Sequence, residues 1–365
     1  MRAVAATLAV LALAGCGGSN HAAPAPGSPA ARTPTAAPAP PSDAARIQTL
    51  LRRPPTGPRL QALRVRDLQS QPDQVDVSGL TAKARVIVRY QIAGVTGTFQ
   101  SVRRVALARR HGRWRVAAEL GRRGLPPWQV ADFAEVRTPH FVVLVPRGTS
   151  VGDLGAVLEA GYAAMRERLT SGRLRGRYLV IDAADPAQAR ALTTQIRGLD
   201  GLAAVADAAV DEEGPAQAVS RVVSLRVLVV ASAFAGLDAE GRQRTIAHEL
   251  THAALAGSTS GRTPSWLVEG TAMYVSGDRR PAPADPHLGR LSRPGAIGRL
   301  SGEAQADAYR AASAAAYAIV ERFGADKLLD LYDAFNDPSL RGEPGPQLVN
   351  RALHRELGIG LSDLP

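Results

Sequence analysis

Residues 248–252 read His248-Glu249-Leu250-Thr251-His252 and determine how the second half of the chain is interpreted. On a helix, side chains four positions apart lie one above the other, so His248 and His252 can direct two imidazoles at one ion. Glu249 falls one step round the helix, where it can contact a water molecule bound by that ion. Zinc lowers the pKa of such a water to about 7, so a neighbouring carboxylate can take its proton. The pentapeptide therefore predicts a zinc-dependent hydrolytic site.

The surrounding sequence places this pentapeptide on a helix that packs against a sheet. Residues 221–231 are apolar and rich in valine, which favours a β-strand. Asp238 follows and is placed to cap a helix. Ile246, Leu250 and Ala254 then recur at helical spacing, opposite the two histidines. We expect this helix to bury its apolar face and to present the histidines from the other.

A second helix supplies a third candidate ligand. Thr263 as cap and Pro264 at the first helical position predict that this helix begins here. Glu269 is its one acidic residue and has apolar neighbours. Because burying an unpaired carboxylate is costly, we expect Glu269 to bind the ion. Two histidines and one glutamate leave the fourth position of a zinc ion for water.

These two helices together resemble the gluzincin clan of metallopeptidases, most closely a bacterial branch. The matching motifs are His248-Glu249-x-x-His252 and Trp266-Leu267-x-Glu269-Gly270-x-Ala272-x-Tyr274. The resemblance covers roughly residues 136–365 and implies a zincin-like fold. It implies that His248, His252 and Glu269 bind one Zn²⁺ ion. It also implies that Glu249 is general base and proton shuttle in the hydrolysis of a peptide bond.

A tyrosine on a later helix is the candidate for stabilising the transition state. Tyr309 precedes Gly324 at a spacing similar to that in aminopeptidase-N-like gluzincins, whose tyrosine donates to the oxyanion. The resemblance implies this role for Tyr309, with Tyr317 as the alternative.

Two features depart from the clan. Met273 stands where thermolysin-like members carry an acidic residue that orients a zinc histidine, and the chain has no Gly-x-Met-Glu-Asn motif for a substrate amino terminus.

The amino terminus indicates export and lipid anchoring. Residues 1–16 combine a positive start with an apolar segment that is too short to span a bilayer. They end in Leu13-Ala14-Gly15-Cys16, which fits a bacterial lipobox, and Cys16 is the only cysteine in the sequence. We expect Cys16 to be lipidated and to anchor the chain on the extracytoplasmic face of a bacterial membrane. The alternative is a plain secretory signal with an incidental cysteine.

The remaining sequence divides into a tether and two domains. Residues 17–41 are almost wholly small residues and proline, which predicts an extended, disordered tether. The rest exceeds the size of one core, so we expect a small α+β domain over 42–128 and a metallopeptidase domain over 129–365. The smaller domain resembles cone-shaped nuclear-transport-factor-like or cystatin-like domains. Its expected elements are a helix over 44–52, a tight turn at His111-Gly112, and strands over 74–77, 84–92, 98–109 and 113–118.

The larger domain is expected to have a sheet-bearing half followed by a helical half, with the metal helix as the floor of the cleft between them. Strands are expected over 141–145 and 178–181. Helices are expected over 153–169, 185–196, 308–323, 325–335 and 347–357. Asp207 and the acidic run at 211–213 are expected to lie in a polar loop. The overall fold class predicted is α+β.

The chain has a high positive charge and further histidines that lie outside the metal motif. The formal net charge is +11, nearly all from arginine, and this composition is typical of a GC-rich genome such as an actinobacterial one. Many arginines fall in the first domain, at Arg103, Arg104, Arg109, Arg110, Arg113, Arg115, Arg122 and Arg123. Outside a membrane we expect anionic lipid or an acidic wall polymer as partner, and no nucleic acid; a solvated sheet face is the alternative. His140, His287 and His354 have no spacing partner and are expected to be structural or exposed.

The sequence thus predicts a lipid-anchored, zinc-dependent hydrolase of peptide or protein substrates. One alternative is a non-catalytic envelope lipoprotein whose zinc domain is structural or binds a partner. Another makes the arginine-rich first domain the functional unit and the zinc domain its accessory. Substitution of Glu249 by glutamine separates the first two hypotheses, because it removes the general base and leaves the proposed ligands in place.

Overall fold

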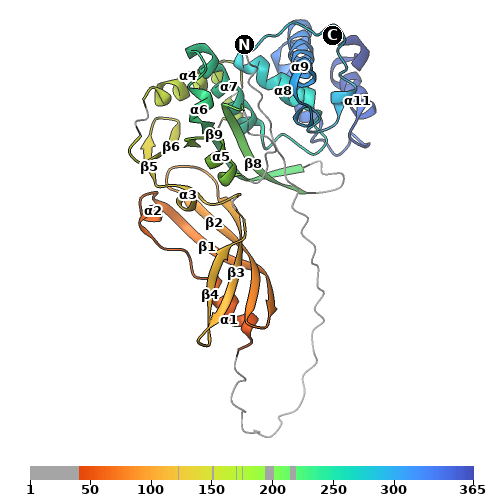
Figure 1. Cartoon of the computed structure of the whole chain (residues 1–365). Coiled ribbons are helices and arrows are strands. Elements are labelled where there is room, and N and C mark those ends of the chain that lie inside the picture. The colour runs from red at the N-terminus through yellow and green to blue at the C-terminus, as the bar shows by residue number, and fades with distance from the viewer. Residues whose placement is uncertain are drawn as a thin grey trace, which may run out of the picture.

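Two sheets and a set of helices make up the described part of the chain (Figure 1). The computed structural model describes residues 41–121, 123–149, 152–169, 171–174, 176–193, 201–213 and 219–365. The expected α+β class is confirmed. Cys16, with the rest of the expected signal segment, and nearly all of the expected tether lie outside the described residues. None of the described helices has the length and apolar character needed to cross a membrane.

The first unit is an antiparallel sheet in the order β1-β2-β3-β4, accompanied by two helices. Their bounds are α1 (Asp43–Leu51), α2 (Pro58–Gln61), β1 (Val65–Ser78), β2 (Thr81–Ile92), β3 (Phe99–Arg110) and β4 (Arg113–Glu119). Every second residue of β2 from Ala82 to Ile92 is buried, so the alternation in sequence gives the sheet one apolar face. His111 and Gly112 both have positive φ, at 50° and 75°, and form the expected tight turn between β3 and β4.

Strand β1 is longer than predicted. It begins at Val65, whereas the sequence favoured a strand only from Gln74. Pro72 lies within it and obscures the strand pattern, because proline lacks a backbone donor. β1 is an edge strand, and its register shifts between Pro72 and Gln74, so the missing N–H is tolerated there.

The second sheet has the strand order β5-β6-β7-β9-β8. The three central strands β6 (Phe141–Pro146), β7 (Tyr178–Ala183) and β9 (Val219–Val230) are parallel, and the edge strands β5 (Phe133–Arg137) and β8 (Ala204–Glu213) are antiparallel to their neighbours. The sequence did not predict the two edge strands. Residues 207 and 211–213 lie on β8, so the expected polar loop was wrong: acidic residues obscure the apolar pattern of an edge strand.

Helices cover one face of this sheet, and the first unit contributes to the packing on the other. α4 (Leu154–Arg168) and α7 (Ala239–Leu255) share an apolar core with Val143, Val180 and Val227. The opposite face belongs to a second core, which continues without a break into the first unit. Shorter helices connect these elements, namely α3 (Pro127–Val130), α5 (Pro186–Leu192) and α6 (Ala231–Phe234). α5 ends four residues before the predicted end of the helix.

The helical half follows, at the blue end of the chain in Figure 1. Its helices are α8 (Ser265–Ser276), α9 (Gly302–Phe323), α10 (Ala325–Ala334) and α11 (Pro346–Leu357). α8 is almost wholly buried and packs against both α7 and α9. This order, with sheet first and helices second, is the one expected from the sequence, and it places α7 and α8 at the junction of the two halves.

Candidate metal centre

Helix α7 carries the pentapeptide and is fixed at its start and along its buried face. The Asp238 side chain accepts a hydrogen bond from the Gly241 N–H at 2.7 Å, so the predicted cap is confirmed. Ile246 and Leu250 are fully buried, as the helical spacing predicted. On α4, Gly161 allows close contact, because a Cβ there would lie 2.6 Å from Cγ2 of Ile246. The apolar face therefore holds α7 against α4 and the sheet.

Helix α8 begins one residue later than predicted. Pro264 is itself the N-cap, and the Thr263 hydroxyl instead accepts a hydrogen bond from the Ser260 N–H at 3.0 Å. Gly270 then brings α9 unusually close, since a Cβ at this position would lie 2.3 Å from the Ala312 carbonyl oxygen. The contact is immediately next to Glu269 and fixes the segment of α8 that carries this carboxylate.

The three predicted ligands meet between these helices. The Nε2 atoms of His248 and His252 are 3.1 Å apart. Glu269 Oε2 lies 3.3 Å from the first and 3.5 Å from the second. The three side chains are buried, with exposed fractions of 8%, 1% and 4% for their residues. Among the described residues this is the group of histidine and acidic side chains arranged so that it could hold a metal ion.

The spacing of these atoms fits a tetrahedral metal ion. Zinc binds histidine nitrogen and carboxylate oxygen at about 2.0–2.2 Å, so two ligands at a tetrahedral angle are about 3.3–3.6 Å apart. The separations of 3.3 and 3.5 Å fall in this range, and the separation of 3.1 Å is slightly below it. Glu269 Oε2 is also buried and receives no hydrogen bond from the described part of the protein. A buried carboxylate oxygen that has two histidine nitrogens nearby but no hydrogen-bond donor favours a bound cation, so the donor set fits a divalent metal.

The charges within the triad support each other. Burial opposes ionisation of the Glu269 carboxyl, but His252 and His248 outweigh it and lower the pKa of Glu269. Burial likewise opposes the charged form of His252, and the adjacent Glu269 carboxylate still raises the pKa of His252. The triad is thus a buried ion pair in which a glutamate stays ionised. An ionised carboxylate is the state needed for binding a metal.

Glu249 lies beside the triad but does not belong to it. It is fully buried, and its Oε2 atom accepts a hydrogen bond from the Ala206 N–H of β8 at 2.6 Å. Its Oε1 atom has no hydrogen-bond partner among the described residues. Burial raises the pKa of Glu249, although His248, His252 and the Ala206 N–H act against this shift. One oxygen is therefore fixed by the backbone, and the other is left available to accept a proton.

The two candidate tyrosines lie in different surroundings on α9. Tyr309 is buried, one turn before the Ala312 contact with Gly270, and the Arg280 guanidinium lies 5.8 Å from its ring centroid. Tyr317 is only partly buried and packs edge-on against Tyr274, with ring centroids 5.5 Å apart. Tyr274 is five residues beyond Glu269 on α8. The role of Tyr309 stays a prediction, and Tyr317 lies toward the far end of α8 from the third ligand.

The carboxylate that supports a zinc histidine in thermolysin-like enzymes has no counterpart at the expected position. Met273 is fully buried in the apolar core, at the position where those enzymes carry an acid. Both Nε2 atoms point into the triad, so the Nδ1 atoms face away from it. No hydrogen bond within the described residues involves either Nδ1 atom. The two rings pack at 82° with centroids 4.7 Å apart, and this packing contributes to their orientation.

Sequence reasoning missed the polar network behind β8. Asp207 is the neighbour of Ala206, is buried, and pairs with Arg226 Nε of β9 at 2.8 Å. Thr193 donates to the same carboxylate at 2.7 Å, and Arg226 also donates to the Leu192 carbonyl. The available signal was Arg226 itself, a charge between the apolar residues Leu225 and Val227 of the strand. A buried arginine requires an acidic partner, but the sequence does not say which one.

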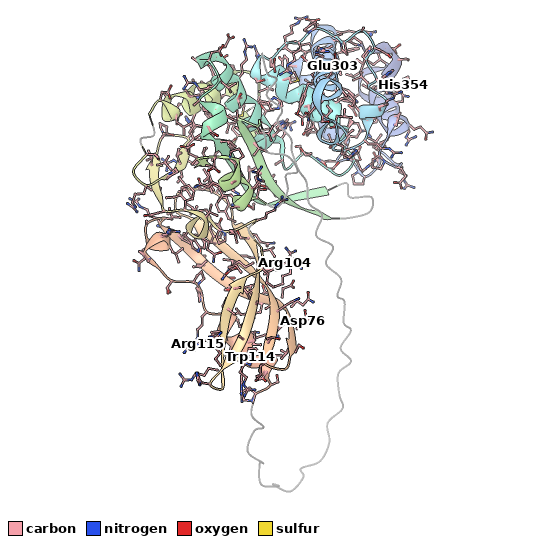
Figure 2. All side chains as sticks on the ribbon, in the orientation of Figure 1. Asp76, Arg104, Trp114, Arg115, Glu303 and His354 are labelled. Carbon is pink, nitrogen blue, oxygen red and sulfur yellow. The ribbon has the colours of Figure 1, made fainter. Side chains whose placement is uncertain are left out.

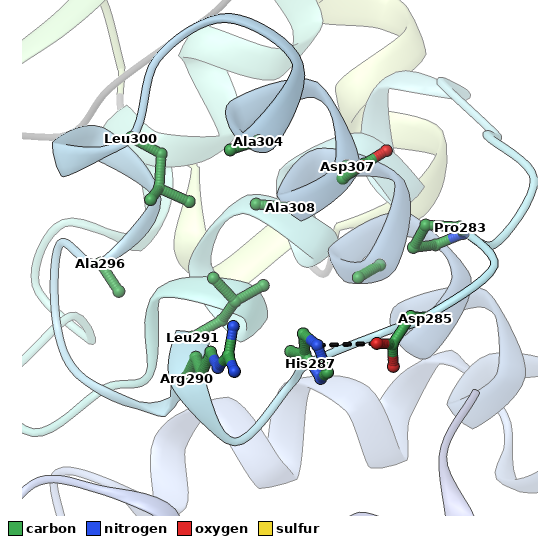
Figure 3. Close-up of a pocket in the computed structure, with 11 residues that line it drawn as sticks. Pro283, Asp285, His287, Arg290, Leu291, Ala296, Leu300, Ala304, Asp307 and Ala308 are labelled. Atoms are coloured by element: carbon green, nitrogen blue, oxygen red, sulfur yellow. Dashed lines mark ion pairs between the residues drawn. The ribbon is translucent and has the colours of Figure 1, made fainter.

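The remaining histidines lie outside the triad, as expected. His140 Nδ1 is 2.6 Å from Glu159 Oε2, and its ring stacks on Tyr162 at 3.9 Å. His287 is exposed and pairs with Asp285 at 2.8 Å. This pair lies at the rim of a cavity of about 250 Å³ between α9 and the preceding segment, and none of the triad residues lines that cavity (Figure 3). His354 is exposed on α11 (Figure 2).

Comparison with known proteins leaves the site to be interpreted from its own geometry. No protein-family model matches the chain. Neither the curated proteins nor the solved structures contain a match to it. The assignment of chemistry to the triad therefore depends on the identity, distances and burial of its residues.

Proposed function

We propose that the chain is a zinc-dependent peptide hydrolase with a zincin-like catalytic unit. The observation that carries this proposal is the convergence of three buried ligands with a fourth, uncoordinated carboxylate beside them. His248, His252 and Glu269 have metal-ligand spacing, and Glu249 adjoins them with one free oxygen. A structural zinc site has four protein ligands and no need for a general base, whereas a hydrolytic site needs both an open position and a base.

The proposed division of labour follows from these positions. His248, His252 and Glu269 would hold the zinc ion, which supplies a Lewis acid that polarises a carbonyl and lowers the pKa of water. Glu249 would accept a proton from the attacking water and deliver it to the leaving amine nitrogen. The Ala206 N–H, at 2.6 Å, keeps the Glu249 carboxylate oriented during both transfers. Tyr309 would donate its hydroxyl proton in a hydrogen bond to the developing oxyanion.

Location and substrate are part of the proposal. The lipobox ending at Cys16 supports a lipid anchor on the outer face of a bacterial membrane. Substrates there would be peptides or exposed protein segments. The lack of a Gly-x-Met-Glu-Asn motif in the sequence gives no support to aminopeptidase specificity.

A non-catalytic zinc module is the rival, and one observation favours it. Glu249 is fully buried and Glu269 is only 4% exposed, so the described surroundings leave little access to the triad. A structural or partner-binding module needs no access for substrate. Metal content alone does not separate the two functions, because both predict a bound zinc ion.

The test combines metal content with hydrolysis in matched variants of the full-length chain. We expect about one zinc per chain by mass spectrometry, lost when His248 and His252 are both replaced by alanine. Glu249→Gln should retain zinc and lose cleavage of a fluorogenic peptide library by at least about a hundredfold. Glu240→Gln is the control, because Glu240 lies on the same helix but is exposed and pairs with Arg244.

Two results would contradict the proposal in different ways. A chain that binds no zinc, even when zinc is added, excludes the metal centre. Zinc binding without any peptide cleavage, unchanged by Glu249→Gln, would support the non-catalytic module instead.

A further inference from the structure

A group of arginines outside the metal centre has too few acidic partners. We call Arg262, Arg341, Arg351 and Arg355 the arginine cluster. Arg262 lies between α7 and α8, Arg341 precedes α11, and the other two are on α11. Arg341, Arg351 and Arg355 line an open hollow of about 670 Å³, together with Ser339, Leu340 and Gly342. Arg262 does not line it, but it contacts Asp337, which also pairs with Arg355. His354, labelled in Figure 2, marks the helix that carries Arg351 and Arg355.

Arg262 is the buried member of this cluster. It is 2% exposed, yet its Nε and Nη2 atoms have no hydrogen-bond partner among the described residues. Its Nη1 atom makes one long hydrogen bond, at 3.3 Å, to the Asp337 carbonyl oxygen. Burial lowers the pKa of Arg262; Asp337 opposes this shift, and Arg351 and Arg355 reinforce it. A buried guanidinium with two unpaired donors and no ion pair among the described residues adds uncompensated positive charge to this part of the protein.

The acidic groups nearby are already engaged. Asp337 accepts hydrogen bonds from Ser339 and pairs with Arg355 Nη1 at 2.8 Å. Arg355 also pairs with Glu356 at 2.7 Å. Both carboxylates thus form ion pairs with Arg355, and among the described residues Arg262 forms no ion pair with an acidic side chain.

Arg351 is in a similar position. It donates to the Arg341 carbonyl oxygen at 2.7 Å and, in the described part of the chain, forms no ion pair. Arg351 and Arg355 are four residues apart on one helix, where like charges repel each other. An anion bound between them would convert this repulsion into attraction.

The arginines of the first unit are arranged differently. Arg85, Arg103 and Arg109 each pair with an acidic side chain, namely Asp73, Glu119 and Asp43 respectively. These pairs satisfy much of the positive charge on that sheet. Arg85 and Arg103 each have a buried Nε atom without a hydrogen-bond partner, as Arg262 does, but both are paired with an acidic side chain, whereas among the described residues Arg262 and Arg351 form no ion pair. The stronger candidate for anion binding is therefore the arginine cluster.

We propose that the arginine cluster is a binding site for a phosphate group, with Arg341, Arg351 and Arg355, which line the hollow, as its donors, and with the nearby charge of Arg262 adding to its positive potential. Guanidinium groups form paired hydrogen bonds to phosphate oxygens, and phosphate offers several acceptors for donors that converge from different elements. The hollow is larger than one phosphate ion, so it can also admit a phosphate ester. Free phosphate and the headgroup of a phospholipid share this chemistry. The site does not involve the metal ligands and is independent of the proposed hydrolysis.

Calorimetric titration of the full-length chain tests this inference at low ionic strength. Inorganic phosphate represents the free ion, and glycerophosphoglycerol represents a headgroup diester. Arg351→Gln should weaken phosphate binding by roughly tenfold or more, because it removes a charge-assisted pair of hydrogen bonds. Arg351→Lys should weaken it by several fold, since the charge is kept but the planar fork is lost. Arg322→Gln removes one exposed charge on α9, where the guanidinium lies over Phe323, and should leave binding unchanged.

Each outcome has a defined meaning. Binding of both probes with the expected order of variants supports a site for phosphate esters, and binding of inorganic phosphate alone supports a site for the free ion. No heat with either probe overturns the proposal. An equal loss in Arg351→Gln and Arg322→Gln also overturns it, because the effect would then be one of net charge. Circular dichroism and zinc content should be unchanged in all three variants, which excludes misfolding as the cause.

Discussion

The buried pair of Asp207 and Arg226 gives the most direct test of how the scaffold is held together. The side chains of the two residues are 7% and 4% exposed, and the ion pair is 2.8 Å long. Replacing Asp207 by asparagine keeps the side-chain shape but leaves the arginine charge buried without its partner. Breaking a buried pair in this way costs about 3–5 kcal/mol, a large part of the roughly 5–15 kcal/mol that stabilises a typical domain.

The double variant should lose much less than the sum of the single ones. Arg226→Met removes the buried charge, so Asp207→Asn combined with Arg226→Met leaves no unpaired ion. We expect a coupling free energy of about 2–3 kcal/mol between the two sites, measured by urea unfolding of the wild type, both single variants and the double variant. The contacts from Arg226 to the Leu192 carbonyl and from Thr193 to Asp207 reduce the effect of each single change. Additive losses, within about 0.5 kcal/mol, would refute the assignment of this pair as a coupled unit.

Three further predictions address packing, pH and metal. Gly270→Ala should destabilise the fold by about 1–3 kcal/mol and weaken zinc binding, because the new Cβ would lie 2.3 Å from the Ala312 carbonyl oxygen. Thermal unfolding measures the loss of stability. Gly155→Ala is the control, since its Cβ would make only an ordinary contact at 3.6 Å. Burial raises the pKa of Asp182 from 3.8 to about 6, so the folded state holds this proton more tightly than the unfolded state, and stability should fall as pH rises from about 4 to about 6. Asp182→Asn should remove this component, at most about 3 kcal/mol, and so stabilise the chain at pH 7 but not at pH 3.5; equal stabilisation at both pH values would contradict the assignment. Chelation of the metal should lower stability by about 2.7 kcal/mol relative to zinc at a hundred times its Kd, as followed by unfolding with and without added zinc, and a chelator without effect would argue against a metal bound by the triad.

The sequence predicted the triad well because its information is local. Little more than one turn of α7 carries His248, Glu249 and His252. Glu269 lies on α8, which follows α7 after a short connecting segment. The structure brings the three predicted ligands within 4.8 Å of one another. The spacing of the two histidines along one helix predicted that they converge, and Glu269 was predicted from its own motif on the second helix.

Contacts between distant strands were not predictable in the same way. The hydrogen bond from Ala206 to Glu249 depends on the register of β8 against β9, where Ala206 lies opposite Val227. Shifting that register by one residue would turn the Ala206 N–H toward β9. The strand itself was missed, because its acidic residues hide the apolar alternation. Pro72 concealed part of β1 for a related reason, since proline disfavours a strand except at an edge.

The core shared by the two units has a consequence for dividing the chain. Tyr90 of the first sheet packs edge-on against Trp128, with ring centroids 4.8 Å apart, and the same apolar cluster continues through Phe133 and Leu144 of the second sheet. A fragment that starts after residue 121 would expose this surface to water, and the complementary fragment would expose its counterpart. Two such fragments are therefore expected to be poorly soluble apart and to reassemble when mixed, as the halves of a split protein do.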